Sequence, residues 1–553
     1  MKIVIVGCVA GGASAAARAR RLDASAEIIA FEKGEHPSFA NCGLPYYVGG
    51  VIEARKKLLV APIDMLRQRH RLDVRPGHEV TSIDTANKTV RVRDLEQNRE
   101  FTEHYDKLIL SPGATPIRPD IPGINSPRVL SLRDLADADR MHAAATADAK
   151  RAVIVGAGFI GVEVAENLVH RGIHVTVLQQ DAQILSPWDP EMITPVDDGM
   201  RDKGIEVLLN ETAIAIQETD AGVSVETRSG RQINADFVVA CIGVSPDNRL
   251  AVKAGLRCAE RGGIQVNAHM QTSDPDVYAV GDAVEVVDFI SNSPTQIPLA
   301  GPANRQGRIA ADHIFGRASR YRGTQGTAVV GVFDTTAAMT GLSEKSLRRL
   351  GRPYEKIYLH PMNHAGYYPG AQQMTLKLLF APDDGRILGA QAVGKGGVEK
   401  RIDVIATAIQ AGMTVEDLEE AELCYAPQYG HAKDAVNMAG FIASNVLRGD
   451  HPIVHVNEIP APSDHAWIDV RTVKEFEAGH IPHATNIPIE GLPERLQELS
   501  RDRPLFVYCR VGQRGYMATR FLNQHGFQAR NLSGGYLTYR LFEKAREIPK
   551  PLI

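Results

Sequence analysis

The sequence predicts an α/β protein of several domains, because two segments each run through a strand, a glycine-rich loop and a helix in that order. The chain has 553 residues, which is too long for a single hydrophobic core. With 44% hydrophobic and 23% charged residues, its composition is that of an ordinary globular protein. A net charge of −4 gives no basic surface for nucleic acid or membranes, so we expect neither as a partner.

The first of these segments begins at the N-terminus. We expect a buried strand over Lys2–Val6, a glycine loop over Gly7–Gly12, a helix, and a second strand over Glu27–Phe31 that ends in Glu32. An acid about 20 residues beyond the loop is typical of a Rossmann-like dinucleotide-binding unit. The loop is a variant, because Val9 stands where the middle glycine of GxGxxG would be.

The second segment carries the complete fingerprint. Gly156–Gly161 reads GxGxxG between a predicted strand, Arg151–Val155, and a predicted helix. Such glycines let backbone amides and a helix N-terminus hold a pyrophosphate. The next strand, His174–Leu178, is followed by Gln179 instead of an acid, so the ribose lacks its usual acceptor. We therefore favour NADH, with NADPH possible.

The six cysteines are scattered over the whole chain, at positions 8, 42, 241, 258, 424 and 509. None forms a CxxC pair, which argues against a disulfide framework and a structural metal site. No apolar run approaches the ~20 residues of a membrane span. We expect separate thiols in a reducing cytoplasm and no metal.

One of these cysteines, Cys42, lies in the stretch Ser38–Tyr47, just beyond the first dinucleotide unit. Ser38 and Asn41 are residues that often begin helices, so we expect Cys42 near a helix start, where the dipole favours a thiolate. The alternative is a buried cysteine that acts as a small hydrophobe.

Three further segments carry a family resemblance. Thr272–Ala283 resembles the second flavin-contacting motif of the pyridine nucleotide–disulfide oxidoreductases, and Leu108–Pro116 and Val238–Gly243 resemble their crossover strands. The resemblance implies that Asp282 binds the ribityl and pyrophosphate part of FAD. The implied cofactor-binding positions are Gly7, Ala10, Gly11, Gly12, Glu32, Lys33, Val80, Ser111, Pro112, Gly113, Gly281, Asp282 and Ala283 for FAD, and Gly156, Gly158, Phe159, Ile160, Gly161, Glu163, Gln179 and Gly243 for the nicotinamide nucleotide.

Within this family, Cys42 decides the branch. Relatives such as glutathione reductase have a second cysteine five positions on, where this chain has Tyr47. A lone cysteine stores oxidising equivalents as a sulfenic acid or as a mixed disulfide with a small thiol. The peroxidase branch has a histidine at the position of Ala10, whereas Ser38–Gly49 closely resembles the coenzyme A disulfide reductases, in which the cysteine pairs with CoA.

That resemblance implies further site residues. Tyr367 and Tyr425 match tyrosines that the partner subunit supplies, so we expect a homodimer, and a phenol there could protonate a leaving thiolate. Aromatic packing at a dimer interface is the alternative. Arg18 and Arg21 are three apart on the first helix and are expected to share a face. The candidate CoA- and substrate-binding residues are Arg18, Arg21, Ser38, Asn41, Arg71, Asn304 and Arg305, and a solvated surface charge is the alternative for each arginine.

A separate module follows a polar linker. A strand over Pro504–Tyr508 leads to Cys509, which heads the loop Arg510, Val511, Gly512, Gln513 and Arg514 before a helix. Such a junction stabilises a thiolate or persulfide anion. The module resembles a rhodanese domain. Phosphatases share the cysteine–arginine loop but have five residues between the two, whereas this chain has four. A module that only binds a partner is the alternative.

The predicted fold class is therefore α/β, with two Rossmann-like domains for FAD and NAD(P)H, an α+β dimerisation domain and a rhodanese-like α/β domain. The expected boundaries are 1–115 with 245–320 for FAD, 116–244 for NAD(P)H, 321–445 for dimerisation, 446–463 for the linker and 464–553 for the rhodanese domain. The expected activity is FAD- and NAD(P)H-dependent reduction of CoA-linked disulfides, persulfides or polysulfides through Cys42, with Cys509 carrying sulfane sulfur. The alternatives are an NADH oxidase or peroxidase that uses a Cys42 sulfenic acid, and a non-enzymatic sulfur-relay or redox-sensing protein.

Overall fold

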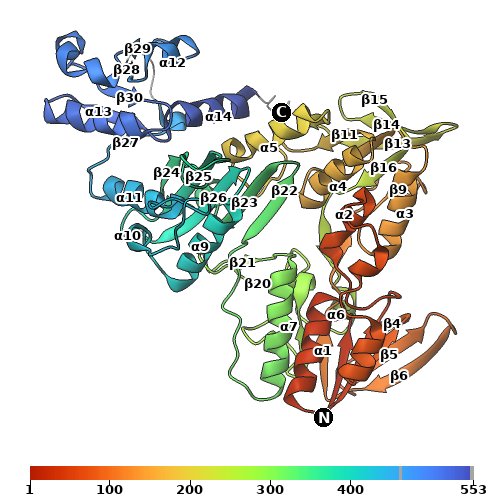
Figure 1. The fold of residues 1–553 in the computed structure, drawn as a ribbon. Helices are drawn as coiled ribbons and strands as arrows, with labels where there is room; N and C mark the ends of the chain where they lie inside the picture. Colours follow the sequence, from red (N-terminus) through yellow and green to blue (C-terminus); the bar gives the residue numbers. More distant parts are fainter. Residues whose placement is uncertain (460–463, 548–553) are drawn as a thin grey trace. The chain divides into compact units, whose positions relative to one another are not determined.

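The computed structural model describes residues 1–459 and 464–547. Residues 460–463 of the predicted linker and 548–553 of the predicted rhodanese domain lie outside the described residues. The chain forms two compact units: Met1–Leu178 with Glu211–Thr324, and Gln179–Asn210 with Gln325–Ile553. Figure 1 shows their elements in sequence colours. None of the described helices has the length and apolar character that a membrane crossing requires.

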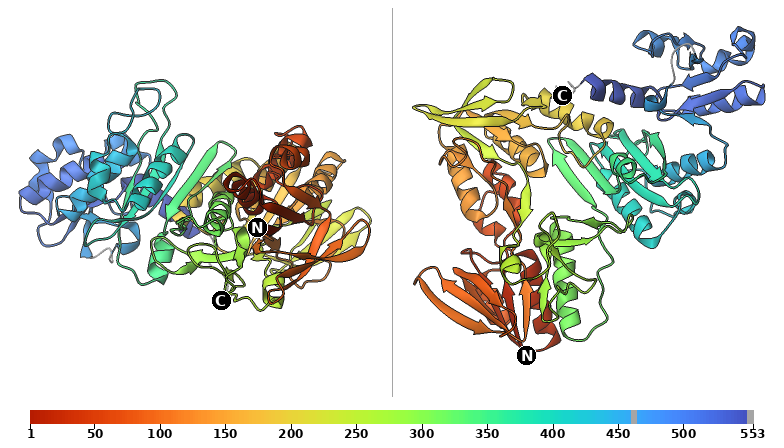
Figure 2. Two further views of the ribbon diagram at one scale, coloured as in Figure 1. Left: turned by 90° about the horizontal axis from the view of Figure 1, so that it is seen from below. Right: turned by 180° about the vertical axis from the view of Figure 1, so that it is seen from behind.

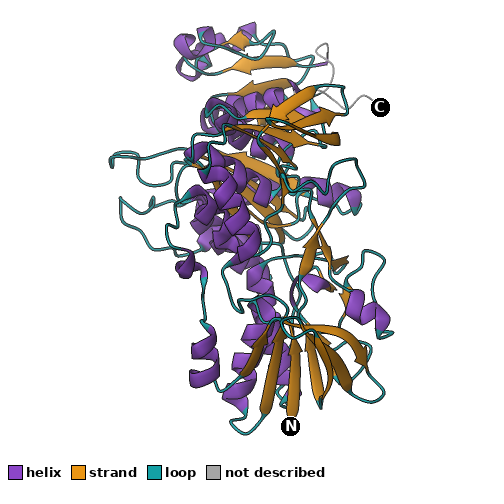
Figure 3. Ribbon diagram, turned by 90° about the vertical axis from the view of Figure 1, so that its right-hand side faces the viewer, coloured by secondary structure: helices purple, strands orange, loops and turns teal. Residues whose placement is uncertain are grey.

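The first unit contains a parallel sheet in the order β19-β7-β1-β2-β3. Its strands lie side by side next to the N-terminus in Figure 3. Helices α1 and α7 pack together beside it (Figures 1 and 2). Since β19 and α7 come from the chain beyond residue 270, this domain is discontinuous in sequence. The bounds are β1 Lys2–Val6, α1 Ala10–Leu22, β2 Glu27–Glu32, β3 Asp73–Pro76, β7 Lys107–Leu110, β19 Val277–Ala279 and α7 Ala300–Ile314.

A second parallel sheet in this unit has β10 at its centre, between β11 and β16, with β9 beyond β16. Gly156 adopts a φ of +101°, and a Cβ at Gly161 would overlap the Gly156 carbonyl, so α4 begins directly against the loop. Two Rossmann-like units are thus confirmed. The bounds are β9 Val129–Leu130, α3 Leu135–Thr146, β10 Arg151–Val155, α4 Phe159–His170, β11 His174–Gln179 and β16 Phe237–Ala240.

Smaller elements complete the first unit. Strand β8 lies within the predicted crossover segment Leu108–Pro116. It pairs antiparallel with β17, which begins directly after the other predicted segment, Val238–Gly243. Antiparallel sheets form from β4–β6 and β13–β15, and short strands β18, β20 and β21 adjoin β19 in sequence. The bounds are α2 Leu44–Gly49, β4 His78–Asp84, β5 Thr89–Asp94, β6 Arg99–His104, β8 Ala114–Pro116, β13 Ala213–Thr219, β14 Gly222–Thr227, β15 Gln232–Ala235, β17 Val244–Pro246, α6 Arg249–Lys253, β18 Ile264–Gln265, β20 Val284–Val287 and β21 Pro294–Thr295.

The second unit contains an antiparallel sheet in the order β22-β23-β26-β25-β24. Helix α9 packs on β23 and β26, and α10 packs on α11. This is the α+β domain that the sequence predicted. The bounds are α5 Pro190–Asp202, β12 Glu206–Leu209, β22 Ala328–Val332, β23 Thr335–Gly341, α8 Glu344–Arg349, β24 Glu355–Leu359, β25 Met374–Phe380, β26 Ile387–Gly394, α9 Val398–Ala411, α10 Val415–Glu420 and α11 Ala435–Leu447.

The C-terminal module of this unit is a parallel sheet in the order β27-β31-β30-β28-β29. Apolar side chains form a core cluster on each face of this sheet. The predicted strand before Cys509 is β30, one residue shorter than expected at its start. The bounds are β27 Ile453–Val454, β28 Ala466–Asp469, α12 Val473–Glu477, β29 Thr485–Asn486, β30 Leu505–Tyr508, α13 Gln513–Gln524, β31 Ala529–Leu532 and α14 Gly535–Glu547.

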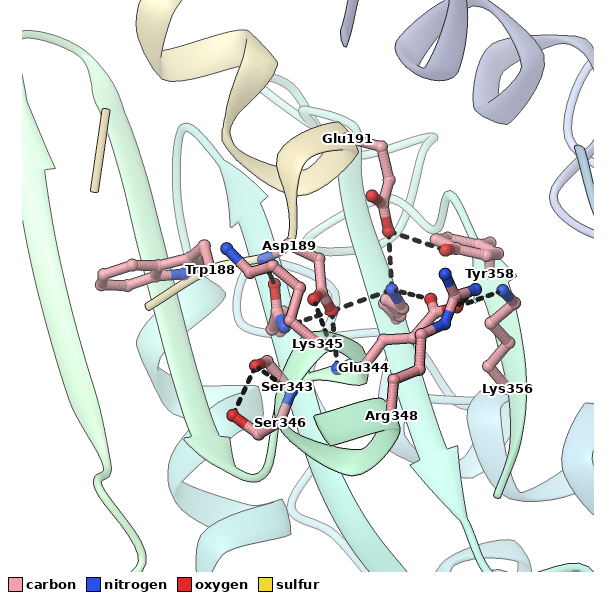
Figure 4. Close-up of polar contacts among 12 residues, drawn as sticks. Trp188, Asp189, Glu191, Ser343, Glu344, Lys345, Ser346, Arg348, Lys356 and Tyr358 are labelled. Carbon is pink, nitrogen blue, oxygen red and sulfur yellow. Dashed lines mark hydrogen bonds and ion pairs between the residues drawn. The ribbon is translucent and has the colours of Figure 1, made fainter. Parts of the chain in front are cut away.

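A buried ionic cluster joins α5 to the antiparallel sheet (Figure 4). Lys377 on β25 contacts Asp189 at 2.9 Å and Glu191 and Glu344 at 2.6 Å each, measured between the ammonium nitrogen and a carboxylate oxygen. Burial would lower the pKa of Lys377, but these carboxylates outweigh it and raise the pKa. The three acids lie close enough to surround a cation, and the Lys377 ammonium group is that cation.

Candidate active site

Cys42 lies in a 3₁₀ turn, Asn41–Gly43, directly before the six-residue helix α2. The residue is exposed, yet the groups around its sulfur remove part of its water, which raises the pKa of the thiol. The carboxylates of Glu163 and Asp282 raise it further. Cys42 therefore lies next to a helix start, as expected, but its surroundings raise the pKa of the thiol, whereas we expected a thiolate to be favoured there.

Two side chains that sequence reasoning did not assign to the thiol lie near it. Burial and Glu166 raise the pKa of Glu163, on α4, to about 7. Burial raises the pKa of Tyr46 to about 12, with smaller effects from Glu163, Glu166 and Cys42. Tyr46 could have been found from its place in the Ser38–Tyr47 stretch, whereas Glu163 was predicted only as a nucleotide-binding residue.

Tyr47, five positions beyond Cys42, belongs to the core of the unit. Its ring stacks on His142 with centroids 4.7 Å apart, and its hydroxyl donates to Asp139 at 3.4 Å. This position therefore packs α2 against α3 and provides no second redox group.

The glycines of the first loop form a close-fitting cradle. Gly7 has a φ of +88°, and a Cβ there would overlap the Ser111 carbonyl, while a Cβ at Gly11 would lie 3.0 Å from Ser111 Oγ. Gly281 lies beside the same hydroxyl. Glu32 accepts hydrogen bonds from the amides of Cys8 and Gly34, both at 2.8 Å. The structure thus brings together predicted FAD residues from four distant parts of the chain.

Arg133 is a member of this region that the sequence analysis missed. Its guanidinium lies against Gly113, and it donates to the amide oxygen of Asn41 at 3.1 Å in the orientation that satisfies that side chain. Burial raises the pKa values of Glu32 and Asp282, and the charge of Arg133 opposes both shifts. A glycine cradle, two carboxylates and an arginine suit a flavin dinucleotide with its ribityl chain and pyrophosphate.

The remaining predicted FAD positions have varied surroundings. Lys33 is exposed and pairs with Glu79 at 2.7 Å, and Val80 is buried on β4. Ala10 begins α1, Pro112 separates Ser111 from Gly113, and Ala283 is buried in the turn that contains Gly281 and Asp282.

The second cradle leads into α4. A Cβ at Gly156 would overlap the Cys241 carbonyl, and Gly243 has a φ of +121°. Gly158, Phe159, Ile160 and Gly161 lie at the N-terminal end of α4, with Gly158 and Ile160 exposed. At the end of β11 the Gln179 amide donates to the carboxylate of Asp181 at 3.0 Å, and Asp181 is exposed. The sequence analysis missed this acid because it stands two residues beyond the strand.

The candidate CoA residues differ in exposure and in their contacts. Arg18 is largely buried and pairs with Asp312 of α7 at 2.6 Å, whereas Arg21 is exposed. Both arginines lie three positions apart on α1, as expected, but only Arg18 is engaged by α7. Ser38 has a φ of +53° and donates its amide to the Cys8 carbonyl at 2.8 Å. The others are exposed, namely Arg71, Asn304 and Arg305, and the Asn304 side chain accepts from Ser14, which the sequence analysis missed.

Tyr367 and Tyr425 are brought together in the second unit, where both are exposed. Their hydroxyls are 2.8 Å apart. This hydrogen bond raises the pKa of Tyr425. The pair can therefore act as one proton-donating group on the surface of its unit.

Cys509 differs from Cys42 in being buried, with 1% of its surface exposed. Its sulfur accepts a hydrogen bond from the Gly512 amide at 3.2 Å, where the chain turns from β30 into α13. Arg514 lies beside the sulfur and pairs with both oxygens of Glu475, at 2.7 and 2.8 Å. Hydrogen bonds from Arg514 help to lower the pKa of Glu475 to about 2. The sequence analysis missed Glu475, which also completes the cap of α12 with Thr472.

The other loop residues have separate surroundings. Arg510 is exposed and donates to Gln373 of the antiparallel domain at 3.3 Å. Val511 is half-buried, Gly512 is buried with a φ of +97°, and Gln513 is exposed at the start of α13. The predicted loop therefore surrounds the sulfur, but only Gly512 and Arg514 point their polar groups toward it.

Comparison with known protein families decides the class of this fold. Residues 1–307 match the pyridine nucleotide-disulphide oxidoreductase model, residues 327–435 the dimerisation domain of the same family, and residues 454–541 the rhodanese-like domain. The chain belongs to the pyridine nucleotide-disulphide oxidoreductases. The family confirms the prediction of an oxidoreductase that uses FAD and a nicotinamide nucleotide as cofactors. The predicted fold class and the predicted C-terminal rhodanese-like domain are also confirmed.

Individual relatives agree with this assignment. A coenzyme A disulfide reductase of Staphylococcus epidermidis is 38% identical over 444 residues, which cover 80% of this chain and 99% of that protein. A crystal structure of reduced Bacillus anthracis CoADR-RHD has a TM-score of 0.96 and 46% identity over 99% of this chain and 98% of the other. A NAD-dependent persulfide reductase from A. fulgidus has a TM-score of 0.91 and 35% identity over 98% and 100%. The predicted resemblance to coenzyme A disulfide reductases fused to a rhodanese domain is confirmed.

Proposed function

We propose that the chain reduces CoA-linked disulfides, persulfides or polysulfides with electrons from a nicotinamide nucleotide, through Cys42 alone. The observation that carries this proposal is an exposed cysteine in the flavin-type unit with a core tyrosine, Tyr47, five positions on. Without a resolving cysteine there, a mixed disulfide at Cys42 would take its second sulfur from a small molecule. The coenzyme A disulfide reductase and persulfide reductase relatives support CoA and persulfides as the source.

The residues that would hold the cofactors come from the two cradles. Gly7, Gly11, Glu32, Arg133 and Asp282 would bind FAD, and the Gly156–Gly161 loop would bind the pyrophosphate of the nicotinamide nucleotide. Bound FAD supplies the transfer of an electron pair from the nicotinamide to sulfur. The exposed carboxylate of Asp181 near the end of β11 would repel a 2′-phosphate, which favours NADH.

The step at Cys42 begins with the thiolate. Its sulfur attacks the disulfide of the substrate, so that a bond from Cys42 Sγ to one substrate sulfur forms while the substrate S–S bond breaks. The other sulfur leaves as a thiolate or hydrosulfide and takes up one proton. Two electrons and one proton then convert the Cys42 mixed disulfide to the Cys42 thiolate and a second thiol.

Tyr367 and Tyr425 are the proposed donors of the proton to the leaving sulfur. Both phenols are exposed and hydrogen-bonded to each other, so one can donate while the other stabilises the charge that results. In the resembled reductases these tyrosines come from the partner subunit. Our proposal therefore includes a homodimer assembled through the dimerisation-type domain at 327–435.

Cys509 is the proposed carrier of sulfane sulfur. The Gly512 amide and the Arg514 guanidinium can stabilise a negative charge on its sulfur, and a persulfide carries such a charge near neutral pH. The long pantetheine arm of CoA is the proposed shuttle for sulfur between Cys509 and Cys42. All six cysteines are free, which suits the reducing cytoplasm that this proposal assumes.

The test is NADH-dependent sulfide release from polysulfide or a small persulfide, measured beside CoA thiol release from CoA disulfide. We expect both activities in the wild type, and Cys509→Ser should lose mainly the release from persulfides. Oxygen-dependent NADH consumption without sulfide release would instead indicate an NADH oxidase or peroxidase. Negligible turnover with every disulfide would indicate a relay or sensing protein.

A further inference from the structure

The loop that carries Cys509 rests on the start of α14. The amide of Tyr536 donates to the Cys509 carbonyl at 2.8 Å, and the amide of Leu537 donates to the Arg510 carbonyl at 3.0 Å. Gly535 has a φ of +63°, and a Cβ there would overlap the Cys509 carbonyl. A displacement at the start of α14 would therefore move the sulfur-bearing loop.

The start of α14 in turn rests on β24, the edge strand of the antiparallel sheet. The Tyr358 amide donates to Ser533 Oγ at 3.1 Å, and a Cβ at Gly534 would lie 2.7 Å from Tyr358 Cβ. Just beyond β24, His360 Nε2 is hydrogen-bonded to Thr538 Oγ1 at 2.9 Å. The residues that support the Cys509 loop therefore also cover β24, the edge strand of the antiparallel sheet.

A second connection reaches the loop directly. Arg510 Nη2 donates to Gln373 Oε1 at 3.3 Å, and Gln373 Nε2 donates to the His360 carbonyl at 2.9 Å. The Gln373 amide is therefore held at both ends. Burial, with a contribution from Arg510, lowers the pKa of His360 to about 4, so the imidazole is neutral near pH 7 and Arg510 is the cation of this group.

The two arginines of the loop differ in how their charges are compensated. Arg514 pairs with the carboxylate of Glu475, whereas Arg510 binds the neutral amide of Gln373. A neutral acceptor orients the guanidinium without cancelling its charge. Arg510 can therefore attract an anionic substrate next to Cys509.

We propose that Gln373 is a positioning residue of the Cys509 site, which holds Arg510 in place to bind anionic sulfur donors, so that the antiparallel domain completes the sulfur-transfer site. This inference rests on the proposed role of Cys509 as a sulfur carrier. With thiosulfate as the donor, the Cys509 thiolate attacks the outer sulfur. The Cys509–sulfur bond forms, the bond to the sulfite sulfur breaks, and sulfite leaves with its electron pair, so the total charge of −3 is unchanged.

The experiment measures sulfite release from thiosulfate, with a thiol as acceptor, by the full-length protein. Gln373→Ala should raise KM for thiosulfate about tenfold and change kcat less than about twofold. The reason is that Arg510 loses its hydrogen bond to Gln373 and is no longer held where its charge binds the donor. Gln373→Glu retains the side-chain length, pairs a carboxylate with Arg510 and should also raise KM. Gln372→Ala is the matched control, since this neighbouring glutamine is exposed, and its KM should equal that of the wild type.

A double-mutant cycle separates positioning from simple support of the fold. If Gln373 acts through Arg510, the double variant Gln373→Ala with Arg510→Ala should have the KM of Arg510→Ala alone. Multiplied effects, or an unchanged KM in both Gln373 variants, would overturn the inference. NADH-dependent CoA disulfide reduction, measured in the same preparations, should stay within about twofold of the wild type, because it depends on Cys42. A wild type that places no extra sulfur on Cys509 would instead refute the proposed function, and this inference with it.

Discussion

Cys42 and Cys509 differ in exposure, in backbone position and in the charged groups around the sulfur. Cys42 is exposed, lies in a short 3₁₀ turn and faces the carboxylates of Glu163 and Asp282, which raise its pKa together with desolvation. Cys509 is buried, accepts a hydrogen bond from the Gly512 amide and lies beside Arg514. The first environment raises the pKa of the thiol, whereas the second offers the sulfur an amide donor and a guanidinium.

In the proposed function, this difference would correspond to separate roles for the two cysteines. At Cys42, where the anion is disfavoured, a mixed disulfide carries no charge on the sulfur. It would therefore be a suitable state to hold until the flavin reduces it. A site built from an amide and an arginine suits a carrier that remains a persulfide anion between two reactions. In our proposal, the charge around each cysteine would separate reduction at Cys42 from sulfur storage at Cys509.

The largest effect that we predict is at Cys42. Cys42→Ser should lower NADH-dependent CoA disulfide reduction about a thousandfold or more, because the covalent intermediate can no longer form. CoA thiol release, followed with a chromogenic thiol reagent, measures the loss. Cys424→Ser is the control matched for exposure, and it should retain wild-type activity. Near-normal reduction by Cys42→Ser would show that another group carries the reaction.

The next largest effect concerns the stability of the unit that holds Cys509. Lys377→Met removes the ammonium group between Asp189, Glu191 and Glu344, and leaves these buried carboxylates facing one another. We expect a loss of about 3–5 kcal/mol in the free energy of unfolding, measured by denaturant titration. Lys395→Met, which removes an exposed pair with Asp334, should cost less than about 1 kcal/mol. Equal losses in the two variants would contradict the role of the buried cluster.

A smaller effect is expected at the tyrosine pair. Tyr425→Phe should lower the rate of CoA disulfide reduction about tenfold or more, because a proton donor is lost. The hydrogen bond with Tyr367 raises the pKa of Tyr425, so Tyr425 stays protonated to higher pH than a lone tyrosine. In Tyr367→Phe the alkaline decline of the rate should therefore begin at lower pH. A pH–rate profile identical to that of the wild type would exclude proton donation by this pair.

The smallest effect is at the partner of Arg514. The pKa of Glu475 is lowered to about 2, so its contribution to stability is complete above the ordinary value of 4.5 and is lost as the pH falls toward 2. Glu475→Gln should reduce the free energy of unfolding by about 1 kcal/mol or less at pH 7. The difference from the wild type should shrink between pH 4.5 and pH 2, in denaturant titrations across that range. A difference that is independent of pH would mean that the pair does not stabilise the fold through charge.

The parts of the site that could be predicted from the sequence are those whose residues are neighbours both in the sequence and in the structure. Strand, glycine loop and helix are contiguous in sequence, so β1 with α1 and β10 with α4 were expected at nearly their observed bounds. Cys509 could be predicted to lie at the turn from β30 to α13 for the same reason.

The parts that could not be predicted depend on contacts between distant residues. The raised pKa of Cys42 comes from desolvation and from Glu163 and Asp282, which are far away in the chain. The pairing of Arg18 with Asp312 on α7 could not be predicted either, since the two residues are far apart in the chain. The contacts of Arg133 with Gly113 and Asn41, and of Arg510 with Gln373, likewise leave no local signature in the sequence.

The most direct test of the separate roles proposed for Cys42 and Cys509 is site-resolved mass spectrometry of the full-length protein, after separate incubation with CoA disulfide and with thiosulfate. The account predicts a CoA adduct on the peptide that contains Cys42 and one additional sulfur on the peptide that contains Cys509, with neither modification exchanged between the two sites. A CoA adduct confined to Cys509, or sulfane sulfur accumulating on Cys42 and absent from Cys509, would contradict it.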